Sequence, residues 1–171
     1  MAKKVSLRQF QEGLVARLKD VQSGTVAQSA SKMGVQVGQE KWLINLPDVS
    51  EVVPLQQLLA VPLTQPWFSG MANVRGVLYS AVDFSRFLGG EPTQSSIDSR
   101  LLLANGKYHM NAGIIVHHML GLKNPDQLQI GATEDLSPWV AAEYVDSQGE
   151  VWKELNMSGL IHHPDFLNVG V

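Results

Sequence analysis

Two adjacent histidine pairs, His117-His118 and His162-His163, are the residues of this chain that most directly suggest metal chemistry. Neighbouring residues of a strand point to opposite faces of a sheet, so the first pair cannot share one ion. Neighbouring residues of a helix lie about 100° apart, which is equally unsuitable for the second pair. The chain also has no cysteine and no His-x-x-x-His spacing. We therefore expect neither a metal site nor a metal cofactor.

Other catalytic patterns are also missing. The only Gly-Lys step, Gly106-Lys107, is followed by Tyr108 where a phosphate-binding loop requires Ser or Thr. The Gly-x-Ser-x-Gly elbow of serine hydrolases does not occur. Acidic residues lie close together in polar, turn-forming segments, namely Glu134 with Asp135 and Asp146 with Glu150. Acids in such contexts are usually solvated, so we expect no catalytic residue, no bound cofactor and no enzyme activity.

An acid within an apolar run and an arginine beside a glycine are more informative. Glu51 interrupts the apolar run from Val49 to Val53. In a regular strand its side chain would lie on the same face as those of Val49 and Val53. Arg75 precedes Gly76, which adopts positive φ at low cost and is typical of turns. A charge beside a buried strand is costly unless it is paired, so we expect a bidentate Glu51–Arg75 ion pair. The pair could simply fix the turn, or the turn could be presented to another protein, and the two interpretations are compatible.

Length and composition limit the remaining classes. The 171 residues are 44% hydrophobic and carry 13 Lys and Arg against 16 Asp and Glu, a net charge of -3. This length fits one domain or a small two-lobed unit. Nucleic-acid-binding proteins usually have a basic excess, so we expect no nucleic-acid partner. No apolar run approaches the roughly 20 residues of a membrane-spanning helix, and the N-terminus lacks the apolar segment of a signal peptide. We expect a cytoplasmic protein without direct membrane insertion.

The chain divides into three parts. Residues 1–21 are predicted to form an amphipathic helix, because apolar residues recur at spacings of three and four from Leu7 to Val21. Its apolar stripe could pack on its own domain or on a partner. Residues 22–31 are small and polar, as in a linker. In residues 32–171, short apolar segments alternate with turn residues, which predicts an all-β domain.

Ten strands and three short helical turns are expected in that domain. The expected strands are Met33–Val37, Lys41–Leu46, Val49–Val53, two in Met71–Phe84 around a turn at Arg75-Gly76, Leu101–Ala104 and Lys107–Ala112 around Asn105-Gly106, Ile114–Leu120, Val140–Val145 and Val151–Met157. The expected helical turns are Leu55–Leu59, Arg86–Leu88 capped by Ser85, and Ser158–Ile161.

The two halves of the domain contain similar segments. Lys41–Asn45 aligns with Lys107–Asn111, and Val82–Leu88 aligns with Leu155–Ile161, with aromatic, apolar, Asn/Asp and Ser types in step. The matches favour two similar small barrels, each with a hairpin, a third strand and a strand that leads into a Ser-capped turn.

Residues Ser69–Phe84 resemble the signature of CheW-like domains, which is a Gly, an apolar pair, Asn-Leu-Arg-Gly, an apolar strand and an Asp-Leu ending. The positions that match are Asn73, Arg75, Gly76, Val82 and Asp83, while Val74 and Phe84 replace leucines. Upstream, Val49–Val53 resembles the family's Val-x-Glu-apolar-apolar strand, and Val61-Pro62-Leu63 resembles its proline-containing loop. The resemblance extends from Lys32 to about Leu167.

This resemblance implies an all-β fold of two five-stranded SH3-like barrels packed around a hydrophobic core. It implies a non-catalytic adaptor that couples the cytoplasmic tip of a methyl-accepting chemoreceptor to a CheA-type histidine kinase, recruited to receptor arrays at the membrane. The Glu51–Arg75 pair resembles the family's ion pair near the receptor-facing surface. The partner-binding residues that we expect are Val49, Glu51, Val52, Val53, Asn73, Arg75 and Gly76. The three valines are candidate apolar anchors, and a role as ordinary core residues is equally compatible.

Segments near the C-terminus, Trp152–Met157 and Ile161–Leu167, resemble the PilI-type adaptors of twitching motility, which points to a type IV pilus pathway. The alternative is a flagellar-type coupling protein, from which the chain departs at Ser80-Ala81 and Lys153-Glu154. Two alternatives belong to other classes. A nucleic-acid-binding β-barrel would need exposed aromatic residues with basic neighbours, and a small enzyme would need a deep polar pocket.

Overall fold

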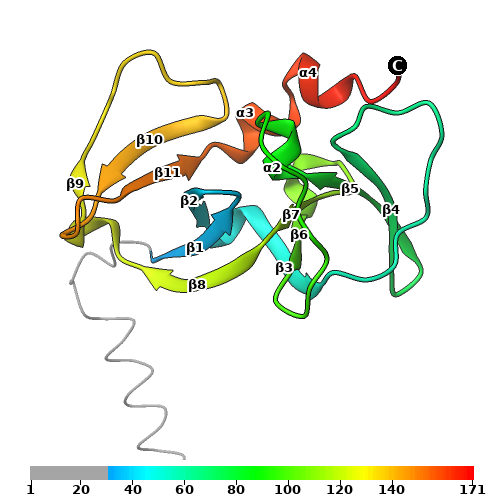
Figure 1. The fold of residues 1–171 in the computed structure, drawn as a ribbon, viewed down its shortest axis with the longest axis horizontal. Coiled ribbons are helices and arrows are strands. Elements are labelled where there is room, and N and C mark those ends of the chain that lie inside the picture. Colours follow the sequence, from blue (N-terminus) through cyan, green and yellow to red (C-terminus); the bar gives the residue numbers. More distant parts are fainter. Residues whose placement is uncertain (1–30) are drawn as a thin grey trace, which may run out of the picture.

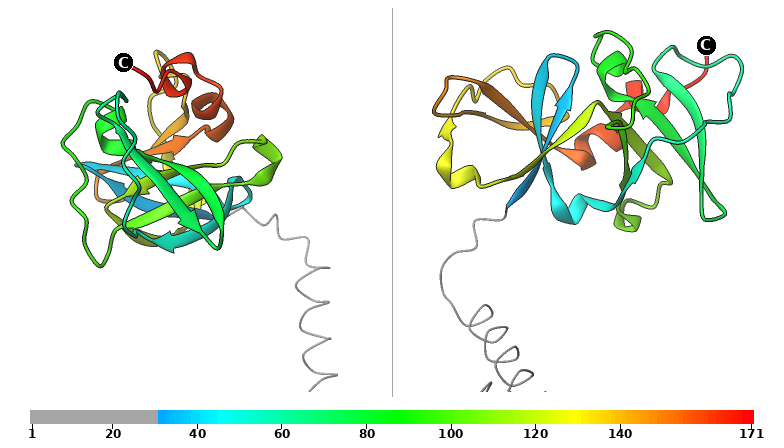
Figure 2. Two further views of the ribbon diagram at one scale, coloured as in Figure 1. Left: turned by 90° about the vertical axis from the view of Figure 1, so that its right-hand side faces the viewer. Right: turned by 60° about the horizontal axis from the view of Figure 1, so that its bottom comes forward.

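The computed structural model describes residues 31–171 as two β lobes that lie side by side (Figures 1 and 2). The expected helix over residues 1–21 and the linker up to residue 30 lie outside the described residues. The strands are β1 Lys32–Val37, β2 Glu40–Asn45, β3 Val49–Pro54, β4 Phe68–Val74, β5 Val77–Asp83, β6 Arg100–Ala104, β7 Ala112–Val116, β8 His118–Lys123, β9 Gln129–Ile130, β10 Val140–Val145 and β11 Val151–Leu155. The helices are α2 Phe84–Phe87, α3 Met157–Ile161 and α4 Pro164–Leu167, with 3-10 turns at Leu46–Asp48, Gly106–Tyr108 and Pro125–Gln127. No helix in this part of the chain is long and apolar enough to cross a membrane.

Each lobe is built on one sheet, with strand orders β8-β1-β2-β11-β10-β9 and β3-β6-β7-β5-β4. The second sheet comes from one continuous stretch, 49–116, and we call its lobe the contiguous lobe. The first sheet combines 32–45 with 118–155, and we call its lobe the split lobe, which holds the blue, yellow and orange strands of Figure 1. The two SH3-like lobes predicted from the sequence are confirmed, although the split lobe gains a sixth strand from the two residues of β9.

The lobes repeat one topology. Apart from the added β9, each sheet has five strands. Neighbouring strands in each sheet are antiparallel except for one parallel pair, which is β2–β11 in the split lobe and β5–β7 in the contiguous lobe. In both lobes the strand after the parallel contact leads into a helix, β5 into α2 and β11 into α3. The match of Val82–Leu88 with Leu155–Ile161 is therefore confirmed. The other match is wrong, because β2 corresponds to β7, whereas Lys107–Asn111 holds a 3-10 turn and a loop. The repeat is circularly permuted, so successive halves of the domain do not form the lobes.

The helices α2 and α3 are capped by Asx side chains, which corrects the expected Ser caps. The Asp83 carboxylate accepts the Arg86 N–H at 3.3 Å, and the Asn156 side chain accepts the Gly159 N–H at 3.0 Å. A residue at the N-cap can reach the N–H three positions on, whereas the following serines already lie inside the helices.

Three other expected elements differ in the structure. Leu55–Leu59 is not a helical turn, because it runs alongside β4 and Leu59 bridges to Met71. Lys107–Ala112 is not a strand. The Asn105 side chain accepts the Lys107 N–H at 2.9 Å and starts a 3-10 turn instead. The expected strand Ile114–Leu120 is divided at His117 into β7 and β8, which belong to different lobes.

Two hydrophobic clusters stabilise this arrangement. The larger one lies between the lobes and combines Val35, Trp42 and Ile44 with Leu102 and other residues of the contiguous lobe. The smaller one fills the contiguous lobe and has as its members Ala72, Val74, Ala81, Leu101, Leu103 and Ile115. Successive residues of β6 therefore enter different clusters, so this strand is buried on both faces.

Candidate functional site

The hairpin of β4 and β5 ends in a two-residue turn, Arg75-Gly76, whose φ angles are 50° and 84°. Two successive positive φ values are typical of the type I′ turn, which matches the twist of paired strands. The Asn73 side chain accepts the Gly76 N–H at 2.9 Å, and the Gln56 side chain donates to the Asn73 carbonyl. The turn that carries Arg75 is thus held by the Asn73 side chain within the hairpin and by Gln56 from the preceding loop.

Arg75 binds Glu51 with both of its terminal nitrogens. Nη1 donates to Oε1 at 2.9 Å and Nη2 donates to Oε2, which confirms the predicted bidentate pair. The Arg75 guanidinium lowers the pKa of Glu51, and the Glu51 carboxylate raises the pKa of Arg75. The Arg75 side chain is nevertheless 72% exposed, so its guanidinium is accessible to a second protein.

The ion pair joins the two edges of the contiguous sheet. Glu51 lies on β3 at one edge, while Arg75 follows β4 at the other. The pair therefore clasps together strands that are separated by three others in the sheet. Beside it, Leu59 and Met71 exchange two backbone hydrogen bonds of 2.8 Å, which cover the free edge of β4. We call the Glu51–Arg75 pair and its turn the clasp.

The expected position of Val49 is wrong, and a β-bulge is the reason. Val49 opposes Ala104 and Glu51 opposes Leu103, so Ser50 is an extra residue in β3. The bulge rotates Val49 to the face of Val52, against the inter-lobe cluster. Val53 packs against the cluster inside the contiguous lobe, on the side of Glu51. All three valines of β3 are half-buried.

Val77 and Leu78 also belong to this surface, although sequence reasoning missed them. Both are exposed at the start of β5, directly after the turn. Their run, Val77-Leu78-Tyr79, is apolar without alternation, so no period-two signal could show which side chains face outward. The clasp therefore presents an accessible guanidinium next to exposed aliphatic side chains.

The C-terminal tail meets the loop before β4 (Figures 1 and 2), and exposed apolar side chains on both segments form a second surface. The Gln65 N–H donates to the Val169 carbonyl at 2.7 Å, and the Val171 N–H donates to the Leu63 carbonyl at 3.1 Å. Leu63 is 79% exposed and has a φ of 58°, an unusual conformation for a leucine. We call this surface the loop–tail patch, and its exposed members are Leu59, Val61, Leu63, Leu167 and Val171. It was not predictable from sequence, because it joins segments about a hundred positions apart.

Lys153 and Glu154, where the sequence departs from the flagellar-type pattern, have structural roles in the split lobe. Lys153 forms an ion pair of 2.6 Å with Glu40, and Glu154 forms one of 2.8 Å with Lys32. Tyr144 also donates its hydroxyl to Glu154 at 3.0 Å. Each of these charges thus has a partner in the same sheet, Lys153 on the adjacent β2 and Glu154 on β1, one strand further away, as polar groups in a half-buried sheet require.

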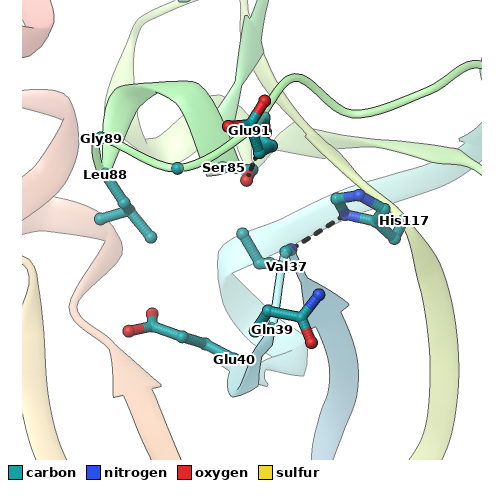
Figure 3. Close-up of a pocket in the computed structure, with 10 residues that line it drawn as sticks. Val37, Gln39, Glu40, Ser85, Leu88, Gly89, Glu91 and His117 are labelled. Atoms are coloured by element: carbon teal, nitrogen blue, oxygen red, sulfur yellow. Dashed lines mark hydrogen bonds between the residues drawn. The ribbon is translucent and has the colours of Figure 1, made fainter.

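A cleft of about 520 Å³ separates the β1–β2 turn from α2 (Figure 3). Ser85 lies in this cleft, but its hydroxyl donates to the Glu91 carbonyl at 2.7 Å. His117 lies on the other side, and its Nδ1 accepts the Gly38 N–H at 3.0 Å. The polar atoms that could form a nucleophile–base pair are therefore engaged with the backbone. Within residues 31–171, no three His, Asp or Glu side chains gather as a metal site would require.

Comparisons with known proteins agree with this geometry. A family model described as CheW-like domain matches residues 32–165. Protein PilI of Pseudomonas aeruginosa is 28% identical over 171 aligned positions, which cover 96% of this chain and 90% of that protein. The crystal structure of the scaffolding protein TtCheW from Thermoanaerobacter tengcongensis superposes with a TM-score of 0.64 at 18% identity, covering 80% of this chain and 94% of that one.

Proposed function

The chain belongs to the CheW-like domain family, and from this premise we propose that it couples a chemoreceptor to a CheA-type histidine kinase. Proteins of this family are coupling scaffolds without catalysis of their own. In the proposed arrangement the protein works in the cytoplasm, at receptor arrays on the membrane. The PilI relative, which aligns over nearly the whole chain, supports a twitching-motility pathway over a flagellar one.

The clasp is the proposed contact for the cytoplasmic tip of the receptor. The observation that carries this proposal is the bidentate pair, which fixes the turn and still leaves the Arg75 guanidinium 72% exposed. Arginine is enriched at the centres of interfaces, and the exposed aliphatic side chains beside it add apolar area that a partner can bury. The proposed contact set is the one expected from the sequence, Val49, Glu51, Val52, Val53, Asn73, Arg75 and Gly76, together with Val77 and Leu78.

The loop–tail patch is the proposed contact for the kinase. An adaptor that holds two proteins at once needs two separate surfaces, and this patch is a second group of exposed aliphatic side chains, formed by the contiguous lobe and the C-terminal tail. Its backbone is tied down by hydrogen bonds between Leu63, Gln65 and the tail, so little ordering is needed on binding.

The proposed mechanism is positional. A scaffold shifts a kinase between states only if the assembled complex binds those states with different affinities. The protein would therefore act by holding the receptor tip and the kinase in a defined geometry. A nucleic-acid-binding barrel is less well supported, because large aromatic residues such as Trp42, Phe84 and Trp152 are buried.

Binding measurements on single-residue variants test both contacts. The receptor's cytoplasmic fragment and the CheA-type kinase of the same organism are titrated separately with the full chain, with Arg75→Glu and with Leu63→Asp. We expect Arg75→Glu to lose the receptor and keep the kinase, and Leu63→Asp to show the reverse. Circular dichroism checks that each variant is folded. Failure of the wild type to bind either protein would contradict the proposed function.

A further inference from the structure

The turn Ser96–Ser99 displays an isoleucine at its corner. Ile97 is 90% exposed, more than any other large apolar side chain of residues 31–171. It precedes Asp98 in a turn closed by the Ser99 N–H, which donates to the Ser96 carbonyl at 3.2 Å. Turn corners favour Pro, Asp, Ser and Gly, whereas β-branched residues favour strands. An exposed isoleucine is therefore an unusual choice for this turn. Natural proteins depart from such local preferences mostly at functional positions.

The turn is rigid because a buried serine organises it. Ser99 is 1% exposed, and its hydroxyl donates to the Gln94 carbonyl at 3.0 Å and accepts the Ser96 N–H at 3.1 Å. From outside, the Arg100 guanidinium donates to the Ile97 carbonyl at 2.7 Å. Ile97 is thus presented on a fixed support and loses little backbone freedom on binding.

The start of the loop is fixed to α2. The buried carboxylate of Asp83 accepts the Thr93 N–H at 2.7 Å and the Thr93 hydroxyl at 2.8 Å. The same side chain caps α2. One aspartate therefore anchors both the helix and the loop that leads to Ile97.

The turn lies within reach of the clasp. Arg100 opposes Pro54 at the end of β3, and the Leu55 N–H donates to the Ser99 carbonyl at 3.2 Å. Glu51 is on the same strand, three residues before Pro54. Strand rise and strand spacing place Ile97 at most about 25 Å from Glu51. A standard interface of about 800 Å² per partner is roughly 30 Å across, so one partner can cover both.

We propose that Ile97 is an anchor for the partner that binds the clasp, namely the receptor tip, and that it fills an apolar socket with a basic rim there. The basic rim follows from charge complementarity, because Glu91 and Asp98 are exposed on the same loop and form no ion pair within residues 31–171. The nearby Arg100 guanidinium is instead bound by the backbone carbonyls of Ile97 and Ser99. This inference rests on the proposed function, and it adds Ile97 to the clasp as a contact for the receptor tip.

The test measures binding of the receptor's cytoplasmic fragment to the full chain by fluorescence anisotropy. Ile97→Ser should weaken binding about tenfold or more, as loss of an interface anchor does. Asp98→Lys should weaken it as well. Ile130→Ser is the matched control, because Ile130 is also an exposed isoleucine, 74%, but lies in the split lobe. It should leave binding unchanged. Since Ile97 makes no core contact, thermal unfolding should not change in Ile97→Ser.

The possible failures are distinguishable. If the wild type binds the receptor fragment and Arg75→Glu does not, unchanged binding by Ile97→Ser overturns the Ile97 inference and leaves the proposed function intact. Loss of kinase affinity in Ile97→Ser without loss of receptor affinity also overturns the assignment to the receptor. So does loss of self-association, measured by light scattering, with receptor binding unchanged. If the wild type binds no receptor, the proposed function falls and this inference falls with it.

Discussion

Replacing Phe87 by alanine tests how the two lobes are held together. The Phe87 ring of α2 lies 5.3 Å from the ring of Trp67, 5.2 Å from that of Trp139 and 5.6 Å from that of Phe166. Trp139 precedes a strand of the split lobe, and Trp67 precedes one of the contiguous lobe. Phe87 is therefore the common neighbour of aromatic residues from both lobes.

The expected loss follows from burial. A fully buried Phe→Ala change costs about 3–5 kcal/mol. Phe87 is only half-buried, so we expect Phe87→Ala to lower the free energy of unfolding by about 2–4 kcal/mol. In a chain of this length, each kcal/mol lowers the melting temperature by roughly 2–4 °C.

Phe87→Leu is the matched control. It keeps most of the apolar volume but loses the edge-to-face contacts, whose energy the aliphatic contacts of leucine replace in part. Its loss should be about 1–2 kcal/mol, smaller than that of alanine. Urea unfolding followed by near-ultraviolet circular dichroism measures both, since Trp67 and Trp139 lie in the cluster. A loss below 1 kcal/mol in Phe87→Ala, or two separate transitions in the wild type, would refute a shared inter-lobe core.

Three further changes have defined outcomes. Asp83→Ala removes a helix cap and leaves the half-buried N–H and hydroxyl donors of Thr93 unpaired, so thermal unfolding should show a loss of about 2–4 kcal/mol. Gly70→Ala should destabilise more than Gly149→Ala in urea unfolding. Both glycines have positive φ, but only a Cβ at Gly70 would collide with neighbouring backbone, so equal losses would contradict this. Arg75 lowers the pKa of Glu51, so the pair's contribution to stability is complete above the unfolded-state pKa and is lost as the pH falls through the folded-state pKa. In an NMR titration, the Glu51 carboxyl should titrate below the usual value of about 4.3, and Arg75→Ala should bring it back toward that value.

Local signals made much of the fold predictable from sequence. The turn Arg75-Gly76 was recognisable because glycine tolerates positive φ, and the structure gives it a φ of 84°. The ion pair with Glu51 was predictable because a charge beside a buried strand needs a partner. These predictions needed only the local sequence and the cost of burying a charge.

Features that depend on tertiary contacts were not predictable. The sequence does not reveal the bulge at Ser50, which changes the face of Val49. The Asn105-Gly106 pair is a strong hairpin signal, yet Asp48 binds the Lys107 amine at 2.8 Å and the Tyr108 hydroxyl at 2.5 Å, which holds a 3-10 turn in place of a strand. In both cases a contact that is distant in sequence overrides a local preference.

The permuted topology has a consequence for the two proposed contacts. The clasp is built entirely from the contiguous lobe, because both Glu51 and Arg75 lie within 49–116. The loop–tail patch also needs Leu167 and Val171, which follow the last strand of the split lobe. Correct placement of this tail therefore depends on the packing between the lobes, whereas the clasp does not depend on it. Loosening the inter-lobe cluster should accordingly weaken kinase binding more than receptor binding, so the packing that joins the lobes would also set how firmly the receptor and the kinase are coupled.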